Sequence, residues 1–250
     1  MIITVIGETC KDIFVYGESK RLSPEAPVPV FNPIYVEENN GMAGNVVENL
    51  QSLDNKLTIN SIHQPDLITK KRFVDDKSNH MFIRVDEGEG HIEPLVLTTG
   101  HIEMIKKSDA VIVSDYNKGF LTEKVLEEIT SHSHFSVMDT KKKIGNKLLN
   151  FFDFVKLNES EFLKHDFDKC WLNKILITLG SRGASYMDTI YPSPDPKETI
   201  DVSGAGDTFT SAFTIKYLET NDVAKSIIFA NEMASIVVSK RGVTTPKKIY

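Results

Sequence analysis

The sequence predicts an α/β protein in which helices cover both faces of a mostly parallel central sheet, with a small β-lid attached. Five short apolar runs have the length and the β-branched content of buried strands, at residues 2–6, 110–113, 135–138, 154–157 and 175–178. Amphipathic segments alternate with these runs. Strands that are apolar on both faces and alternate with helices are typical of a parallel sheet between two helical layers.

The helices are predicted from apolar residues that recur at helical spacing. One helix begins at Gly41 and gathers Ala43, Val46, Leu50 and Leu53 on a single face. Two others are expected near residues 122–129 and 223–239, where the same spacing returns.

Two segments break this rhythm and predict the lid. Residues 14–38 and 70–87 contain extended runs with alternating faces, joined by hairpin-like turns. Prolines at positions 24, 27, 29 and 33 exclude a helix and a central sheet position for the first segment. We therefore expect a single domain over residues 1–250, with a β-lid from about residues 13–38 and 70–87.

The composition is that of an ordinary enzyme. The chain has 250 residues, of which 40% are hydrophobic, and a formal net charge of −6. It lacks the basic footprint of a nucleic-acid-binding protein and a polybasic membrane patch, and the run Lys141-Lys-Lys143 predicts a solvated surface. The apolar residues 1–6 are too few for a signal peptide or a membrane span, so we expect a cytoplasmic protein. Its two cysteines fit no metal-ligand spacing.

The most informative motif is Asp201-Val-Ser-Gly-Ala-Gly-Asp207, which runs directly into a helical pattern over residues 208–218. Backbone N–H groups at Gly204 and Gly206, together with the helix dipole, would form an anion cradle. A carboxylate at Asp207 is suited to taking a proton from a hydroxyl that attacks a bound phosphate. The pattern indicates phosphoryl transfer to an alcohol. The alternative is a simple turn with a helix cap, because Ser, Gly and Asp all favour helix starts.

Polar residues follow the predicted strands at the end where α/β proteins bind ligands. They are Asp12, Asp115, Asp139, Asn158 and Gly180. Any one of them could be a turn residue. Their recurrence at successive strand ends predicts a shared site at the carboxyl edge of the sheet.

In this order, the motifs resemble those of the ribokinase/PfkB-type carbohydrate kinases. The loop ending at Asp207 is similar to the family's signature near the C-terminus. Further matches are Gly41-Met-Ala-Gly-Asn45, Asn158-Glu-Ser-Glu161, Thr178-Leu-Gly-Ser-Arg-Gly183, Ala230-Asn231 and Lys240-Arg-Gly-Val-Thr244. The resemblance covers nearly the whole chain. It implies a ribokinase-like fold and an ATP-dependent carbohydrate kinase with ATP and Mg²⁺ as cofactors, and it implies a monovalent-cation loop around Asp201.

The resemblance also implies a role for each matching residue. Asp207 would be the general base, with N–H groups of Gly204, Ala205 and Gly206 stabilising the transferred phosphoryl group. Sugar hydroxyls would be bound by Asp12, Gly41 and Asn45. The nucleotide would be bound by Asn158, Glu161, Thr178, Gly180, Gly183 and Asn231. Of these, Asn158 and Glu161 would also organise Mg²⁺ through water.

A narrower resemblance points to a phosphorylated acceptor. Residues 21–30, Thr69-Lys-Lys-Arg72, Arg84-Val-Asp86 and Ser114-Asp-Tyr-Asn-Lys-Gly119 are similar to the kinase module of bacterial heptose kinases, which act on the anomeric hydroxyl of D-glycero-D-manno-heptose 7-phosphate. This resemblance implies that the acceptor contacts Arg72, Arg84, Asp115 and Lys118. It also implies a homodimer formed through the β-lid, in which Arg21 enters the site of the partner subunit. Solvated lid charges are the alternative for each cation.

The chain departs from the family pattern in three places. Only residues 54–68 separate the helix after Gly41 from the second lid segment, so a β-α-β passage is expected to be missing, and the connection around residues 191–196 is short. Asn40 and Met42 stand in the sugar motif and predict an altered acceptor pocket. Two alternatives stay open: a kinase of another acceptor, such as a ketohexose phosphate or a nucleoside, and a non-catalytic sugar-phosphate-binding protein. A binding protein needs no proton acceptor at Asp207, which favours the enzyme.

Overall fold

An eight-stranded sheet forms the centre of the molecule in a computed structural model that describes residues 1–90, 92–194, 204–238 and 245–246. The strand order is β12-β11-β10-β9-β8-β7-β1-β4. Consecutive neighbours from β10 to β4 are parallel, and they comprise β10 (Ile175–Thr178), β9 (Phe154–Asn158), β8 (Ser136–Thr140), β7 (Ala110–Asp115), β1 (Ile2–Gly7) and β4 (Thr58–Ile62). The hairpin of β11 (Ala184–Tyr186) and β12 (Thr189–Tyr191) is antiparallel and closes one edge.

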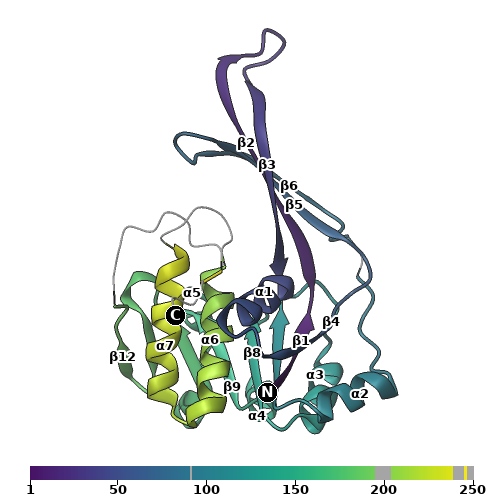
Figure 1. The fold of residues 1–250 in the computed structure, drawn as a ribbon, viewed down its shortest axis with the longest axis vertical. Coiled ribbons are helices and arrows are strands. Elements are labelled where there is room, and N and C mark those ends of the chain that lie inside the picture. The colour runs from purple at the N-terminus through teal and green to yellow at the C-terminus, as the bar shows by residue number, and fades with distance from the viewer. Residues whose placement is uncertain (91, 195–203, 239–244, 247–250) are drawn as a thin grey trace.

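Helices cover both faces of this sheet, as predicted (Figure 1). One face is covered by α1 (Ala43–Leu53), α6 (Ala205–Thr220) and α7 (Val223–Val238). The other is covered by α2 (Thr99–Lys106), α3 (Glu123–His132) and α4 (Asn146–Phe151). Strand β1 is apolar on both faces because each face is covered by helices. Its Ile3 and Val5 pack under the first set of helices, and its Ile6 packs under the second.

The five predicted strands of the body are all present, and the elements that were not predicted include β4, α2, α4 and the β11–β12 hairpin. Strand β4 lies within residues 54–68, so the shortened passage keeps a strand that pairs in parallel with β1. Helix α2 was missed because only Ile105 is buried on it, which gives little apolar periodicity. The β11–β12 hairpin was missed because each strand has only three residues.

The first helix begins two residues later than predicted, at Ala43. Gly41 and Met42 are the last residues of β3 (Pro29–Met42), and Met42 has a positive φ of 56° where the strand turns into the helix. Short helical turns α5 (Glu159–Phe162), η1 (Lys169–Lys174) and η2 (Gly180–Arg182) follow β9 and flank β10.

The lid is a separate four-stranded sheet in the order β3-β2-β5-β6 that projects from the body (Figure 1). Its other strands are β2 (Thr9–Leu22), β5 (Ile68–Asp75) and β6 (Met81–Glu87), so it extends further toward the body than the predicted segments. Strand β2 begins only two residues after β1 ends. Asp12, which was predicted a little after the first strand, therefore lies within a lid strand.

The two faces of the lid differ in chemistry. The paired row Phe14, Arg72 and Arg84 belongs to the face that carries Asp12, because side chains alternate along a strand. The adjacent row contains Val36, Phe73 and Ile83 and belongs to the opposite face. On that opposite face Ile83 and Val36 are more than half exposed, at 56% and 54%. The lid thus presents a charged face and an exposed apolar face.

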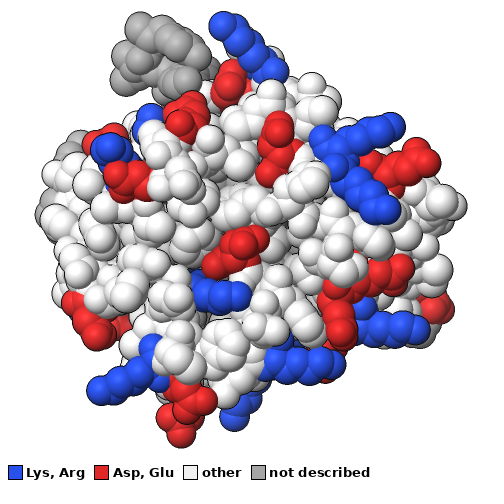
Figure 2. Space-filling model, turned by 90° about the horizontal axis from the view of Figure 1, so that it is seen from below, with Lys and Arg blue, Asp and Glu red and all other residues white. Residues whose placement is uncertain are grey.

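The end of the body opposite the lid has a mixed surface. Figure 2 shows Lys and Arg interspersed with Asp and Glu on the described part of this face, rather than gathered by sign. None of the helices in the described ranges is both long enough and apolar enough to cross a bilayer.

Candidate active site

Helix α6 begins at the predicted anion cradle. Gly204 precedes it with a left-handed φ of 81°, a conformation that glycine adopts without a steric penalty. Ala205 and Gly206 are its first residues, and Asp207 lies in its first turn. Residues 201–203 lie outside the described part of the chain, so the predicted cation loop around Asp201 does too, as do residues 240–244 of the adenine-side motif.

Asp207 is buried, with 5% of its surface exposed, and two residues from other elements contact its carboxylate. The Asn45 amide, from α1, donates a hydrogen bond to Asp207 Oδ2 at 2.7 Å. The Tyr116 hydroxyl, from the loop after β7, donates to Asp207 Oδ1 at 3.3 Å. Burial and the Asp207 charge hold the pKa of Tyr116 well above its usual value, so this hydroxyl keeps its proton.

The surroundings of Asp207 make it a better base than an ordinary aspartate. Burial and the nearby Asp139 carboxylate raise its pKa to about 6, against the lowering effects of Asn45, Lys156 and Lys141. A carboxylate with this pKa is ionised at neutral pH and binds a proton more readily than an exposed aspartate.

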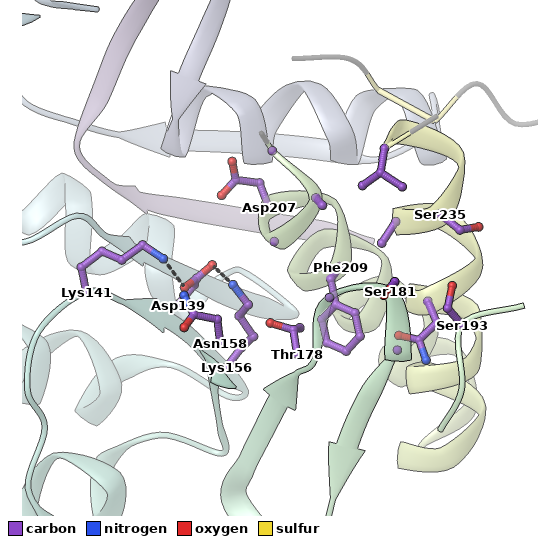
Figure 3. A pocket seen from close by; sticks show the side chains of 18 of the residues that line it. Asp139, Lys141, Lys156, Asn158, Thr178, Ser181, Ser193, Asp207, Phe209 and Ser235 are labelled. Atoms are coloured by element: carbon purple, nitrogen blue, oxygen red, sulfur yellow. Dashed lines mark hydrogen bonds and ion pairs between the residues drawn. The ribbon is translucent and has the colours of Figure 1, made fainter. Parts of the chain in front are cut away.

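A cavity of about 700 Å³ opens on one side of Asp207 (Figure 3). It is lined by Asn158, Thr178, Gly180, Gly183 and Asn231, which the family motifs assign to the nucleotide. Gly183 is required by packing, because a Cβ there would lie 2.2 Å from the Tyr191 carbonyl oxygen. The Asn231 amide donates to that same carbonyl at 2.8 Å and so ties α7 to the sheet edge beside the cavity.

The Asn158–Glu161 motif forms a reciprocal helix cap. Asn158 Oδ1 accepts from the Glu161 N–H at 2.8 Å, and Glu161 Oε2 accepts from the Asn158 N–H at 2.8 Å. Glu161 Oε1 also pairs with Lys141 at 2.8 Å. Only Asn158 of the two is among the described residues that line the large cavity.

Two lysines beneath the cradle, Lys141 and Lys156, were not predicted as site residues, and both pair with Asp139, one of the predicted strand-end residues. Asp139 lies between Lys156, at 2.9 Å, and Lys141, at 4.0 Å, as Figure 3 shows. All three line the large cavity, and Lys141 is exposed there, as predicted for the lysine run. Burial alone would lower the pKa of Lys141, but Asp139 and Glu161 raise it, which keeps the ammonium charged. The sequence signal was available for Asp139, which follows a strand.

Lys156 lies directly against the cradle. It is only 3% exposed, and a Cβ added at Gly206 would be 2.6 Å from its Nζ. Its ammonium therefore adds positive charge to the N-terminal turn of α6. No sequence pattern indicated this role, since Lys156 stands in an apolar strand pattern.

A second cavity, of about 230 Å³, opens on the other side of Asp207 between the body and the charged face of the lid. It brings together the predicted acceptor residues Asp12, Gly41, Asn45, Arg72 and Arg84, and adds Cys10, Met42 and Lys70. Gly41 is required by packing, because a Cβ there would lie 2.2 Å from Asp12 Oδ2. This close approach explains the glycine of the sugar motif.

The cations of the smaller cavity are already paired with carboxylates. Arg72 binds Asp12 at 2.5 Å. The Arg84 guanidinium binds Asp86 through two hydrogen bonds of 2.8 Å. An anionic ligand would therefore compete with resident carboxylates for these side chains.

Two predicted acceptor residues are not among the described residues that line either cavity. The Asp115 carboxylate is buried, accepts from Thr140 at 2.9 Å and pairs with Lys142 at 3.1 Å, so it organises the loops after β7 and β8. Lys118 binds Glu89 at 2.5 Å. Its loop is held by Glu8, a fully buried carboxylate that accepts from the N–H groups of Tyr116 and Lys118.

The two cavities meet at Asp207. Tyr116, Gly204 and Asp207 line both of them, so the Asp207 carboxylate lies at their junction. A group bound at the cradle and a hydroxyl in the smaller cavity would both lie beside one carboxylate, an arrangement suited to group transfer.

The charged groups at the large cavity fit a nucleotide with Mg²⁺. No cluster of three or more His, Cys, Asp or Glu side chains forms a protein cage for a metal among the described residues. Mg²⁺ bound with a nucleotide needs only one or two carboxylates besides the phosphates. Asp139 Oδ1 is buried and accepts no hydrogen bond from any described residue, so this oxygen is available to bind Mg²⁺.

A family model described as pfkB family carbohydrate kinase matches residues 95–249. The chain belongs to this family. The match confirms the family and the enzyme class that the motifs predicted, a carbohydrate kinase.

Curated relatives of this pfkB-family chain include the Bifunctional protein HldE of Helicobacter pylori (strain Shi470). It is 30% identical over 295 residues, an alignment that covers 96% of this chain and 63% of that protein. The protein of the same name from a Nitratiruptor species is 30% identical over 291 residues, covering 97% of this chain and 62% of that protein. The chain thus spans less than two thirds of these relatives. Both alignments are longer than its 250 residues, so the relatives carry segments that it lacks.

Solved structures confirm the ribokinase-like fold. Ribokinase from Thermotoga maritima has a TM-score of 0.73 at 16% identity, covering 97% of this chain and 94% of that one. Arabidopsis thaliana ribokinase complexed with ribose and ATP has a TM-score of 0.69 at 14% identity, covering 98% and 96%. Phosphofructokinase-2 from Escherichia coli in complex with potassium has a TM-score of 0.68 at 14% identity, covering 97% and 94%.

Proposed function

We propose that this protein is an ATP-dependent kinase that phosphorylates the anomeric hydroxyl of a sugar phosphate similar to heptose 7-phosphate. The observation that carries the proposal is the position of Asp207 at the junction of two cavities. A donor phosphate in the larger cavity and an acceptor hydroxyl in the smaller one would meet at its carboxylate. The motif resemblance to heptose kinases supports the acceptor, and the solved ribokinase complexed with ribose and ATP supports the donor.

In the proposed reaction, Asp207 accepts the proton of the acceptor hydroxyl as its oxygen bonds to the γ-phosphorus of ATP. The bond from the γ-phosphorus to the bridging oxygen breaks, and ADP leaves. The N–H groups of Gly204, Ala205 and Gly206 face the transferred group, and Lys156 adds charge beneath them. These fixed groups stabilise the negative charge that spreads over the phosphoryl oxygens.

We further propose that Asp139 and Asn158 hold the Mg²⁺ that accompanies ATP, directly or through water. Bound there, Mg²⁺ would neutralise charge on the donor phosphates. Glu161 contributes by fixing Asn158 in the reciprocal cap and by pairing with Lys141. Dependence on a monovalent cation belongs to the same proposal, and the solved relative in complex with potassium supports it.

The acceptor would lie across the smaller cavity. Asp12 and Asn45 offer oxygen and amide groups for sugar hydroxyls near the base. Lys70 and Arg84 reach the same cavity from β5 and β6 and would bind the acceptor's phosphate. Arg72 is bound to Asp12, so its first task is to fix that carboxylate.

We also propose a homodimer formed through the exposed apolar face of the lid. Ile34, Val36 and Ile83 are each more than half exposed there, which is unusual for large apolar side chains that lie close together. Arg21, near the tip of the long β2–β3 hairpin, could reach the partner's site in such a dimer. An ATP-dependent enzyme would work in the cytoplasm.

A panel assay tests the proposed function. Protein and Mg-ATP are incubated with heptose 7-phosphate, the same heptose without phosphate, fructose 6-phosphate, ribose and adenosine, and ADP release is measured. We expect the highest kcat/KM with heptose 7-phosphate and a product phosphorylated at the anomeric position. A higher kcat/KM with another acceptor would replace the substrate. No ADP above background with any acceptor, with sugar phosphate still bound, would favour the non-catalytic binding protein.

A further inference from the structure

A carboxylate connects the lid to the body at the edge of the smaller cavity. Glu89, two residues after β6, lies between Lys70 of the lid and Lys118 of the loop after β7. Its Oε1 is 3.1 Å from Lys70 Nζ and its Oε2 is 2.5 Å from Lys118 Nζ. The Lys70 side chain is 13% exposed and lines the cavity.

The two contacts of Glu89 are unequal. Lys118 donates a hydrogen bond of 2.5 Å to Oε2, whereas the buried Oε1 has a longer contact, of 3.1 Å, with Lys70. Burial alone would raise the pKa of Glu89, but the contacts with Lys118 and Lys70 lower it, so the group is a carboxylate. Of its two lysine contacts, Glu89 therefore has the longer and weaker one with Lys70.

The backbone on both sides favours this arrangement. The N–H of Lys118 is fixed by the buried Glu8, so Lys118 is a firm anchor. Gly88 and Gly90 flank Glu89. Gly88 packs closely against the backbone of β5, since a Cβ there would lie 2.3 Å from the Leu67 carbonyl oxygen, whereas a Cβ at Gly90 would meet nothing within 4 Å. The open space at Gly90 lets the chain after Glu89 adjust while Glu89 stays bound to Lys118.

Charge also distinguishes Lys70 from the other cations of the cavity. Arg72 and Arg84 each have a carboxylate of their own, Asp12 and Asp86. Lys70 and Lys118 share the single carboxylate of Glu89. Lys70 is thus the cation of this cavity whose existing ion pair is the easiest for an incoming anion to replace.

We infer that Glu89 restrains Lys70 until the anionic group of the acceptor takes it, so that Glu89 sets the affinity for a phosphorylated acceptor. Lys118 then acts through Glu89 and does not contact the acceptor. Because Lys118 neutralises part of the charge of Glu89, it weakens the ion pair between Glu89 and Lys70. This inference deepens the proposed function and rests on it only for the nature of the acceptor.

Binding of inorganic phosphate tests the inference without turnover. Calorimetric titrations are run on the full chain, with and without saturating Mg-AMPPNP to fill the larger cavity. We expect Glu89→Gln to bind phosphate about three- to tenfold more tightly than wild type, because Lys70 is released from its ion pair. Glu89→Asp should lie between the two, and Lys70→Met should weaken binding at least as much as Glu89→Gln strengthens it.

Glu87→Gln is the matched control. It removes the same charge two positions before Glu89, and the carboxylate of Glu87 contacts Thr69. It should leave phosphate binding unchanged. Weaker or unchanged binding in Glu89→Gln would overturn the inference, and so would an equal gain in Glu87→Gln.

A double-mutant cycle isolates the part of Lys118. Lys118→Met should weaken phosphate binding in the wild-type background, because Glu89 then holds Lys70 alone, and should have little effect in Glu89→Gln. An equal loss in both backgrounds would mean that Lys118 binds the anion itself and would overturn the indirect role. Failure of Mg-AMPPNP to bind would count against the proposed function instead. The titration without nucleotide would still measure how Glu89→Gln changes the affinity for phosphate.

Discussion

The Asn45 side-chain amide donates a hydrogen bond to the Asp207 carboxylate at 2.7 Å, across 162 residues of sequence. This bond joins α1, which directly follows the lid strand β3, to the first turn of α6. It lowers the pKa of Asp207, whereas burial and Asp139 raise it, with about 6 as the result. The same contact therefore positions the Asp207 carboxylate and shifts the pH at which it loses its proton.

The pH dependence of activity should report this balance. With Asp207 as the base, kcat/KM should fall about tenfold per pH unit as the pH drops below about 6, because protonation removes the acceptor of the hydroxyl proton. In Asn45→Ala the loss of the hydrogen bond raises the pKa of Asp207, so the fall should begin at a higher pH. Asn150→Ala, at an exposed position, is the control. A profile that stays flat down to pH 4.5 in folded enzyme would exclude Asp207.

The raised pKa of Asp207 also predicts a stability effect. The folded protein, with a pKa of about 6, holds this proton more tightly than the unfolded chain, with 3.8, so ionisation destabilises the fold as the pH rises between these values. Asp207→Asn should therefore increase the free energy of unfolding at pH 8 by up to about 3 kcal/mol. The gain should vanish below about pH 4, where both states are protonated. Denaturant unfolding at both pH values measures it, and a loss of stability at pH 8 would contradict the burial effect.

Gly206 should not tolerate a side chain. A Cβ there would lie 2.6 Å from Lys156 Nζ, so Gly206→Ala must displace the ammonium that supports the anion cradle. We expect kcat to fall by at least about tenfold, since a fixed electrostatic contact in the transition state is disturbed. Gly145→Ala is the matched control, because a Cβ there meets nothing within 4 Å. Equal activity of the two variants would show that the contact with Lys156 is unimportant.

If the protein dimerises through the lid, its average mass in solution should rise with concentration, and a charge on the apolar face of the lid should prevent this. Ile83→Lys places a charge on the exposed apolar face and should shift the protein from dimer to monomer in analytical ultracentrifugation. Lys71→Ala, on the same face but at a charged position, should leave the dimer intact. A wild-type protein that remains monomeric at all concentrations would exclude the dimer.

The central sheet and the cradle could be predicted because their signals are local. Apolar runs identify buried strands wherever they pair, and the glycines before Asp207 carry their own backbone requirement. The pairing partner of β4 and the placement of α2 depend on contacts with distant residues, which no local pattern contains.

The site could be predicted only in part for the same reason. Asp207 and Asn45 stand in recognisable motifs, but the ion pairs of Lys156 and Glu89 are with charges that only the fold brings to them. Asp115 shows the converse, because its motif suggested an acceptor contact while its carboxylate is engaged by Thr140 and Lys142.

Acceptor-dependent ADP release by Asp207→Asn tests the proposed phosphoryl transfer most directly. It should be compared with Glu219→Gln, which removes an exposed carboxylate from the same helix. With Asp207 as the general base, kcat should fall about 10²- to 10⁴-fold in Asp207→Asn, while the affinity for Mg-AMPPNP stays within about twofold of wild type. Glu219→Gln should match wild type in both. Turnover by Asp207→Asn within a few-fold of wild type would contradict the assignment of the base.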